Sequence, residues 1–316
     1  MPARWTAMLA LTGALSAAPG SSLGGPVEQP PRGMKGARTA RAAPGSSLGG
    51  AVEQPQGLFV ARPARPTLVA RPLLEWTAAG LGGAVWLTTG ALVKPKIAPD
   101  RCRWCDSNGF DDEFRKLRWS DRHAADLTSD VISYGVAPAA AAGAVVLAGA
   151  HDGRLAEVSA DLAIVAEAAV SAGLVGEALR LSTARERPSV HALSADEKTR
   201  TSSPENNNLS FVSGHAAISF ALAIGSGTVA TLRHRRLAPL VWTVGLGLAA
   251  ATSYLRVASD EHYATDVLGG ITVGAAAGLA FPLLHRRRDR DETGEHVVAT
   301  VAPAPGGALL VLRWGR

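Results

Sequence analysis

The sequence predicts an all-α fold, a bundle of six transmembrane helices that follows a disordered N-terminal region. Three observations lead to this prediction. Apolar residues make up 47% of the 316 residues, whereas charged residues make up 19% and aromatic residues 5%. The apolar residues are mainly Ala, Val, Leu and Gly, and they gather in blocks of about 20 residues, the length that a helix needs to cross a bilayer. Arginine clusters stand beside these blocks, as is typical of membrane proteins.

Six apolar segments account for the predicted bundle. Their Gly and Ala content favours close packing of helices in lipid. The third segment contains Asp161, Glu167 and Glu177, whose side chains are expected to face the bundle interior or the membrane interfaces. For Glu167 a structural hydrogen bond is favoured over a supporting role in a functional site. The segments are residues 76–93, 132–149, 161–179, 216–232, 237–255 and 267–284.

The chain on either side of the bundle has a different composition. Residues 1–18 resemble a secretory signal peptide, with an apolar stretch followed by small residues. Residues 19–70 are rich in Pro, Gly and Ser, and this region is predicted to be disordered. A 13-residue repeat falls almost wholly within it: residues 18–30 recur as residues 43–55, with Pro26 replaced by Ala51. The helical domain is expected over residues 71–290. Residues 291–316 form a C-terminal tail, in which a short hairpin around residues 303–306 is one option.

Two features lie between the first and second apolar segments. Phe110, Phe114 and Leu117 repeat at helical spacing among charged residues, which favours an amphipathic helix in the membrane interface, although a plain surface helix fits nearly as well. Cys102 and Cys105 are the two cysteines of the chain. One pair cannot complete a four-ligand zinc site, and no thioredoxin-like context surrounds it. A local disulfide outside the cytoplasm is therefore favoured over free thiols.

The arginine clusters predict the orientation of the bundle. One cluster, residues 233–236, joins the fourth and fifth segments, and the other, residues 286–288, follows the sixth. The positive-inside rule places both in the cytoplasm. Six spans that begin in the cytoplasm conflict with a cleaved signal peptide, and the arginine clusters carry more weight. The net charge of +5 thus reflects membrane orientation, and no nucleic-acid-binding motif accompanies it.

A polar stretch lies just before the sixth segment, at the predicted extracytoplasmic end. His262 and Asp266 are four residues apart and would share one face of a helix. A carboxylate placed there accepts the proton of one imidazole nitrogen and leaves the other nitrogen free to attack. Arg256 offers a planar fork of donors that suits phosphate oxygens. By itself this set is equally compatible with surface decoration.

Two further polar patches are expected at the same end. Ser213, Gly214 and His215 open the fourth segment, so the Ser213 hydroxyl and the Gly214 amide lie among the free N–H groups of a helix start, where anions bind readily. Arg180 and Arg187 stand at the end of the third segment and add two fixed cations. The polar, turn-rich segment 189–210 between these patches is read either as a rim that selects substrates or as a spacer.

Together the three patches resemble the signature of the type 2 phosphatidic acid phosphatase superfamily, which also contains vanadium haloperoxidases and bacterial acid phosphatases. That signature reads K-x6-R-P, P-S-G-H and S-R-x5-H-x3-D, and this sequence has R-x6-R-P, V-S-G-H and L-R-x5-H-x3-D in the same order. Arg180, Val212 and Leu255 replace the usual Lys, Pro and Ser. Arginine keeps the charge but changes the hydrogen-bond geometry, and the other two replacements remove no catalytic atom.

The resemblance implies a metal-independent membrane phosphatase that hydrolyses lipid phosphate monoesters or polyprenyl diphosphates through a phosphohistidine. In the family's roles His262 is the nucleophile, Asp266 orients it, and His215 protonates the leaving oxygen and then activates water. The residues implied to bind the phosphoryl group are Arg180, Arg187, Ser213, Gly214 and Arg256.

The expected partners are the lipid phosphate substrate and the bilayer, with no nucleic acid, no metal and no cofactor. The chain is expected to be an integral membrane protein with its active site on the extracytoplasmic face, and the sequence makes no prediction about its oligomeric state. Two alternatives stay open: a vanadate-dependent haloperoxidase that uses the same anion pocket, and a non-catalytic membrane protein that binds phospholipid.

Overall fold

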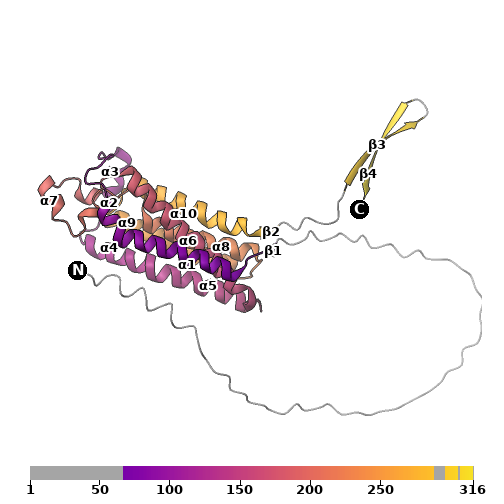
Figure 1. Cartoon of the computed structure of the whole chain (residues 1–316), viewed down its shortest axis with the longest axis horizontal. Coiled ribbons are helices and arrows are strands. Elements are labelled where there is room, and N and C mark those ends of the chain that lie inside the picture. Colours follow the sequence, from indigo (N-terminus) through magenta and orange to yellow (C-terminus); the bar gives the residue numbers. More distant parts are fainter. Residues whose placement is uncertain (1–66, 288–295, 305–306, 316) are drawn as a thin grey trace, which may run out of the picture. The chain divides into compact units, whose positions relative to one another are not determined.

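A computed structural model describes residues 67–287, 296–304 and 307–315. The predictions for residues 1–18 and for residues 19–66 concern segments outside these ranges. Between residues 67 and 287 the structure is dominated by long helices that pack side by side into a bundle (Figure 1). The predicted all-α class is confirmed for this part of the chain.

The bundle consists of long helices, and several short helices lie in the segments that connect them. The first long helix continues through a π-helical turn, and a second π-helical turn joins α4 to α5. The elements are α1 (Pro72–Thr88), η2 (Thr89–Val93), α2 (Lys94–Ile97), α3 (Gly109–Arg115), α4 (Arg122–Val131), η3 (Ile132–Val136), α5 (Ala137–His151), α6 (Leu155–Thr183), η4 (Pro188–Val190), α7 (Ala195–Thr199), η5 (Pro204–Asn206), α8 (Gly214–Leu232), α9 (Ala238–Ala258) and α10 (Ala264–Leu284).

Within the described residues, five helices are long and apolar enough to cross a membrane. They are the continuous helix Arg122–His151 and the helices α6, α8, α9 and α10, and they contain the last five predicted segments apart from Leu237, which is the N-cap of α9. The first predicted segment, residues 76–93, is also helical within α1 and η2, and it packs against α6, but it falls outside this group of five. The described residues therefore contain the helices of the predicted bundle, and α1, with 17 residues, is shorter than the five helices named above.

Helix α8 lies at the centre of the bundle and packs against α5, α6, α9 and α10. Its contact with α10 depends on small residues. A Cβ atom at Gly274 would lie 2.3 Å from the carbonyl oxygen of Ala217, so only glycine allows the two backbones to approach this closely. At the start of both helices, the Ser213 amide donates to the carbonyl oxygen of Asp266 over 2.9 Å. Close packing of α8 and α10 thus brings two of the predicted polar patches together.

Short strands accompany the helices. Strand β1 (Thr67–Leu68) pairs antiparallel with β2 (Arg286–Arg287), which ties the start of α1 to the end of α10. Strands β3 (His296–Ala304) and β4 (Gly307–Gly315) pair antiparallel with Ala304 opposite Gly307. The hairpin expected around residues 303–306 is therefore confirmed.

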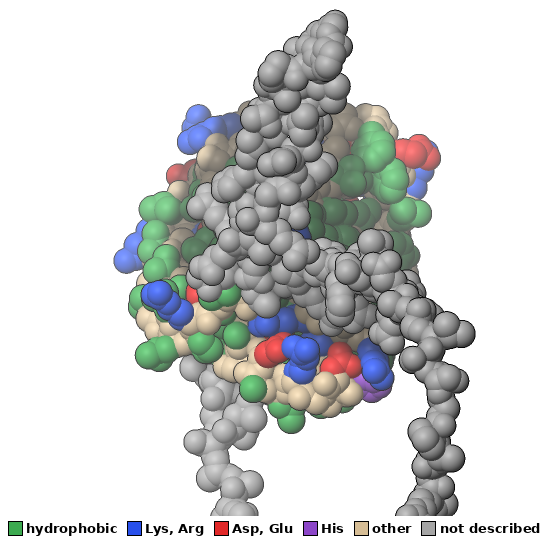
Figure 2. Space-filling view, turned by 90° about the vertical axis from the view of Figure 1, so that its right-hand side faces the viewer, with side chains coloured by type: hydrophobic (Ala, Val, Ile, Leu, Met, Phe, Trp, Pro, Cys, Tyr) green, Lys and Arg blue, Asp and Glu red, His purple; other side chains and the backbone are tan. Residues whose placement is uncertain are grey.

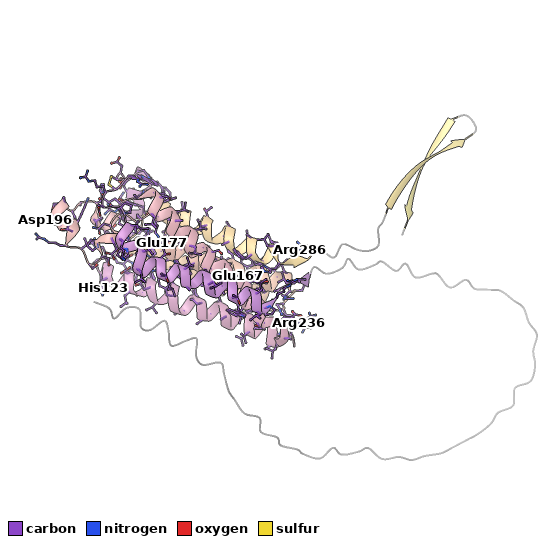
Figure 3. All side chains as sticks on the ribbon, viewed as in Figure 1. His123, Glu167, Glu177, Asp196, Arg236 and Arg286 are labelled. Carbon is purple, nitrogen blue, oxygen red and sulfur yellow. A yellow bond between two sulfur atoms is a disulfide. The ribbon has the colours of Figure 1, made fainter. Side chains whose placement is uncertain are left out.

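Both arginine clusters belong to one end of the bundle, because α8 ends at Leu232 and α10 ends at Leu284. Figure 3 shows Arg236 and Arg286 at this end and His123 and Asp196 at the other. Seen face on, this end carries basic and acidic side chains close together (Figure 2). Arg233 and Arg235 pair with Asp161 of α6, at 2.8 and 3.3 Å.

The acidic residues of α6 point inward, as predicted. Asp161, Glu167 and Glu177 are 1%, 7% and 3% exposed. They lie at different levels, since Glu177 is near the end with the polar patches and Glu167 is nearer the arginine clusters (Figure 3). Each therefore has its own partners rather than a share in one network.

Candidate active site

The three polar patches meet at the end of the bundle opposite the arginine clusters. The guanidinium group of Arg180 lies against Gly214, where an added Cβ atom would be 3.0 Å from Nη1 of Arg180. Arg187 and Arg256 both donate to the carboxylate of Glu261. Residues that are far apart in the sequence thus form one cluster of cations, which is named the cationic pocket below.

His262 lies in the short connection between α9 and α10 and is 1% exposed. Its Nδ1 atom is 2.8 Å from the carbonyl oxygen of Ser210. A carbonyl oxygen can only accept, so Nδ1 carries the hydrogen and Nε2 keeps its lone pair. Burial, followed by the nearby guanidinium groups of Arg256 and Arg187, holds the pKa of His262 well below its usual range. The imidazole is therefore neutral near pH 7, the state that a nucleophile needs.

Asp266 supports His262 differently from the prediction. Its Oδ2 atom is 3.8 Å from Nδ1 of His262, too far for a hydrogen bond. Helix α10 begins at Ala264, so His262 precedes the helix and the two side chains do not share a helical face. Asp266 instead accepts from the Ser210 hydroxyl over 2.5 Å and from the Tyr263 amide over 2.9 Å. Ser210 thus contacts both residues, through its carbonyl oxygen and its hydroxyl.

Arg185 is a site residue that the sequence did not single out. It is fully buried and donates to Asp266 over 2.5 Å and to Asp111 over 2.7 Å. Its guanidinium carbon lies over the rings of Trp104 and Tyr263, at 3.8 and 4.2 Å from their centroids. Cation–π contacts of this kind stabilise a desolvated guanidinium. The one feature of the sequence that could have indicated Arg185 is its position between Arg180 and Arg187, the two arginines predicted to bind the phosphoryl group.

Helix α3 anchors this network. The predicted helix is present, and Phe110 and Phe114 are exposed on it as expected, at 48% and 39%. Its inward side chain is acidic, because Asp111 is fully buried and accepts from the Thr265 amide over 2.9 Å as well as from Arg185. The apolar residues of α3 therefore lie on its exposed face, whereas Asp111 on the buried face fixes the helix against Arg185 and the start of α10.

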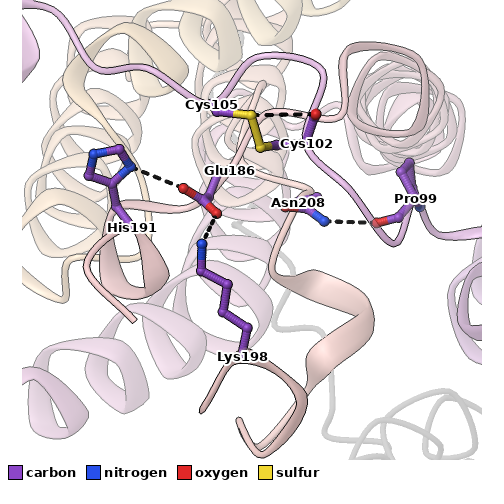
Figure 4. The surroundings of a disulfide bond; sticks show 7 residues. All are labelled: Pro99, Cys102, Cys105, Glu186, His191, Lys198 and Asn208. Carbon is purple, nitrogen blue, oxygen red and sulfur yellow. Dashed lines mark hydrogen bonds and ion pairs between the residues drawn. A yellow bond between two sulfur atoms is a disulfide. The ribbon is translucent and has the colours of Figure 1, made fainter. Parts of the chain in front are cut away.

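The predicted disulfide is confirmed between Cys102 and Cys105 (Figure 4). It closes the loop that carries Trp104. Nearby, the Asn208 side chain donates to the carbonyl oxygen of Pro99 over 2.9 Å, so this loop is joined to segment 189–210.

Segment 189–210 is itself tied to the residues that follow α6. Glu186 accepts from Lys198 over 2.5 Å and lies 3.0 Å from His191 (Figure 4). Of the two readings of this segment, these contacts favour a rim packed around the pocket.

Helix α4 supplies acidic residues that the sequence did not predict. Nε2 of His215 is 2.8 Å from Oδ1 of Asp130, and the Tyr134 ring packs against the imidazole at 4.7 Å between centroids. Arg256 donates to Asp126 over 2.5 Å. The imidazole of His215 and the guanidinium group of Arg256 thus each have a carboxylate partner on α4.

The cationic pocket still holds donors for an anion. The Nε–H groups of Arg180, Arg187 and Arg256 are buried and have no acceptor among the described residues. Burial, together with the guanidinium groups of Arg256 and Arg180, lowers the pKa of Arg187 to about 9. An oxyanion in the pocket would relieve this repulsion. The carboxylate of Glu261 lies between Arg187 and Arg256.

The helix start predicted to bind anions is also present. Helix α8 begins at Gly214, and Ser213 precedes it as the N-cap, fully buried, with its hydroxyl 3.5 Å from the Ala216 amide. The positive end of α8 thus points at the pocket that Arg180 lines. All eight predicted site residues lie around this one region.

Comparison with known proteins gave one finding. A family model described as the PAP2 superfamily matches residues 161–290. The matched region spans α6 to α10 and includes all eight predicted site residues, while Asp111 of α3 and Asp130 of α4 lie before it. No curated protein and no solved structure matches the chain.

Proposed function

We propose that this chain, whose residues 161–290 match the model of the PAP2 superfamily, is a membrane phosphatase that hydrolyses lipid phosphate monoesters or polyprenyl diphosphates without a metal ion. One observation carries the proposal. A neutral histidine, with its Nδ1 hydrogen held by the Ser210 carbonyl, stands beside three guanidinium groups. That combination is a nucleophile next to an oxyanion pocket.

The first step forms a phosphohistidine. Nε2 of His262 attacks phosphorus while the bond from phosphorus to the leaving oxygen breaks, and His215 gives its proton to that oxygen. The ring of His262 then carries a positive charge. The Ser210 carbonyl, 2.8 Å from Nδ1, and the Asp266 carboxylate, 3.8 Å away, stabilise this charge.

The second step releases phosphate. Neutral His215 accepts a proton from a water molecule, whose oxygen attacks phosphorus as the N–P bond breaks. His262 returns to its neutral form and His215 to its protonated form. Asp130, 2.8 Å from His215, stabilises the proton at both ends of the cycle.

The pocket supplies the positive charge that this transition state needs. Phosphoryl transfer spreads negative charge over three oxygens, and fixed cations stabilise it. Arg180, Arg187 and Arg256, with the start of α8 at Gly214, provide those cations and donors. The substrate must displace Glu261, because its carboxylate lies between two of the arginines.

The membrane setting suggests the substrate class. Five helices have the length and hydropathy of membrane spans, and the pocket lies at one end of the bundle, where a phosphate headgroup can enter while its chain stays in lipid. Both arginine clusters lie at the other end, which supports an extracytoplasmic site by the positive-inside rule.

Phosphate release by purified protein tests the proposal. The chain is assayed in detergent with phosphatidate-type monoesters and polyprenyl diphosphates, in the presence of a chelator, beside a His262→Ala variant. The expected result is phosphate release by the wild type alone. Halide oxidation that requires added vanadate would instead favour a haloperoxidase, and lipid binding without turnover would favour a non-catalytic role; both would overturn the proposal.

A further inference from the structure

A second group of polar side chains lies at the end of α10 that is remote from His262. Within the described residues, Glu75 of α1, Glu167 of α6 and His285 after α10 bring one ligand atom each to within 4.8 Å of one another. Nε2 of His285 is 3.4 Å from Glu75 and 3.9 Å from Glu167. Helix α10 has 21 residues and is therefore about 31 Å long. This group is thus separate from the phosphatase site.

The group consists of acceptors that face one another. Nδ1 of His285 is 2.8 Å from the carbonyl oxygen of Phe281, so Nδ1 carries the hydrogen and Nε2 presents a lone pair. Ionised carboxylates also only accept. Glu167 is 7% exposed, and the described residues give it no polar partner besides Glu75 and His285. A buried carboxylate in this setting is stabilised either by sharing a proton with its neighbour or by a cation.

The spacing also fits a metal ion better than direct hydrogen bonds. Zinc binds histidine nitrogen and carboxylate oxygen at about 2.0–2.2 Å, which places tetrahedral ligands about 3.3–3.6 Å apart. The nitrogen–oxygen distances of 3.4 and 3.9 Å lie near that range, whereas an N–H···O bond would be near 2.9 Å.

Other contacts hold two of the three side chains in place. The Phe281 carbonyl fixes the His285 ring, which is the usual outer-shell partner of a metal-bound histidine. The Arg71 amide donates to the other oxygen of Glu75 over 3.3 Å. Glu75 and His285 are therefore oriented by contacts within the protein itself.

We propose that Glu75, Glu167 and His285 bind one divalent transition-metal ion of the Zn²⁺ class. Imidazole with carboxylates suits this class of ion. The bound ion joins α1, α6 and α10, next to the β1–β2 pairing that already connects the ends of α1 and α10. It fastens α1 to the bundle and takes no part in phosphate chemistry.

Metal titration of the whole chain tests the site. The protein carries an affinity tag without histidine, is stripped with EDTA in detergent, and is titrated with Zn²⁺ against a chromophoric chelator. We expect one Zn²⁺ per chain and a melting temperature that rises with Zn²⁺ concentration. Co²⁺ should give the visible absorption of a tetrahedral nitrogen–oxygen site.

Matched variants assign the ligands. His285→Gln and Glu167→Gln should each weaken Zn²⁺ binding at least tenfold, and Glu75→Gln gives a third test should either variant fail to fold. Glu157→Gln, which changes an acidic residue at the same end of α6, and His262→Ala at the other end should bind like the wild type. The proposal is overturned by a wild type that takes up no stoichiometric Zn²⁺, or by uptake that none of the three ligand variants changes.

Discussion

The two ends of the bundle both contain buried arginines paired with carboxylates, but these pairs have different consequences. At the arginine-cluster end, Arg235 is 5% exposed and pairs with Glu157 and Asp161. At the pocket end, Arg185 is fully buried and pairs with Asp111 and Asp266. Both are buried ion pairs. The pocket end differs because its carboxylate network holds a neutral imidazole next to further guanidinium groups, whose Nε–H groups find no acceptor in the part of the chain that the structure describes. A buried ion pair is therefore structural by itself, and reactivity depends on what it positions.

The largest expected difference between the two ends concerns the nucleophile. His262→Ala removes the atom that attacks phosphorus, so kcat should fall by at least about 10⁴-fold. Asp161→Asn, at the other end, should leave kcat within about twofold of the wild type. Phosphate release measured at equal amounts of folded protein checks both. Normal turnover by His262→Ala would contradict the assignment.

The two buried arginines give the next contrast. Arg185→Ala and Arg235→Ala each remove a buried cation that pairs with two carboxylates, which costs about 3–5 kcal/mol of stability. Only Arg185→Ala should also lower kcat, by about 100-fold, because it frees Asp266 and displaces Ser210 and His262. Melting temperature and kcat, measured where both variants are folded, separate the two effects. Equal kcat in both would show that Arg185 has no positioning role.

Substitution of Glu261 should have a smaller effect, and it should strengthen anion binding rather than impair the site. Its carboxylate occupies the position between Arg187 and Arg256, so Glu261→Gln should strengthen inhibition by orthovanadate about fivefold, as expected for a partly exposed ion pair. Glu157→Gln, whose carboxylate pairs with arginines at the other end, is the matched control. Weaker inhibition in Glu261→Gln would mean that the carboxylate helps to bind the anion.

The pH dependence should show the smallest change. Attack requires unprotonated His262, and burial with the neighbouring arginines lowers its pKa. Activity should therefore persist as the pH falls below about 6.5, where an ordinary histidine becomes protonated. The measurement is kcat/KM against pH, corrected for the second ionisation of the substrate phosphate. An acid limb at or above pH 6.5 would contradict a buried, neutral nucleophile.

Much of the fold followed from local sequence features. The apolar segments predicted the long helices, and the C-x-x-C spacing favoured the disulfide between Cys102 and Cys105. The motif residues Arg187, His215 and His262 were predicted to converge, and they do. These features could be predicted because helix length, helix starts and motif spacing depend on neighbours in the chain.

The partners of the buried charges were decided by tertiary structure. His262 donates to the Ser210 carbonyl rather than to Asp266, and Arg185 meets Asp111 of α3. Glu167 faces His285 at the end remote from the pocket. Sequence by itself determined which segments are apolar and which residues carry chemistry. Only the packing of the helices decided which buried charges meet. The partner of a desolvated group lies on another element of the chain, so the sequence around that group carries no periodic pattern that identifies the partner.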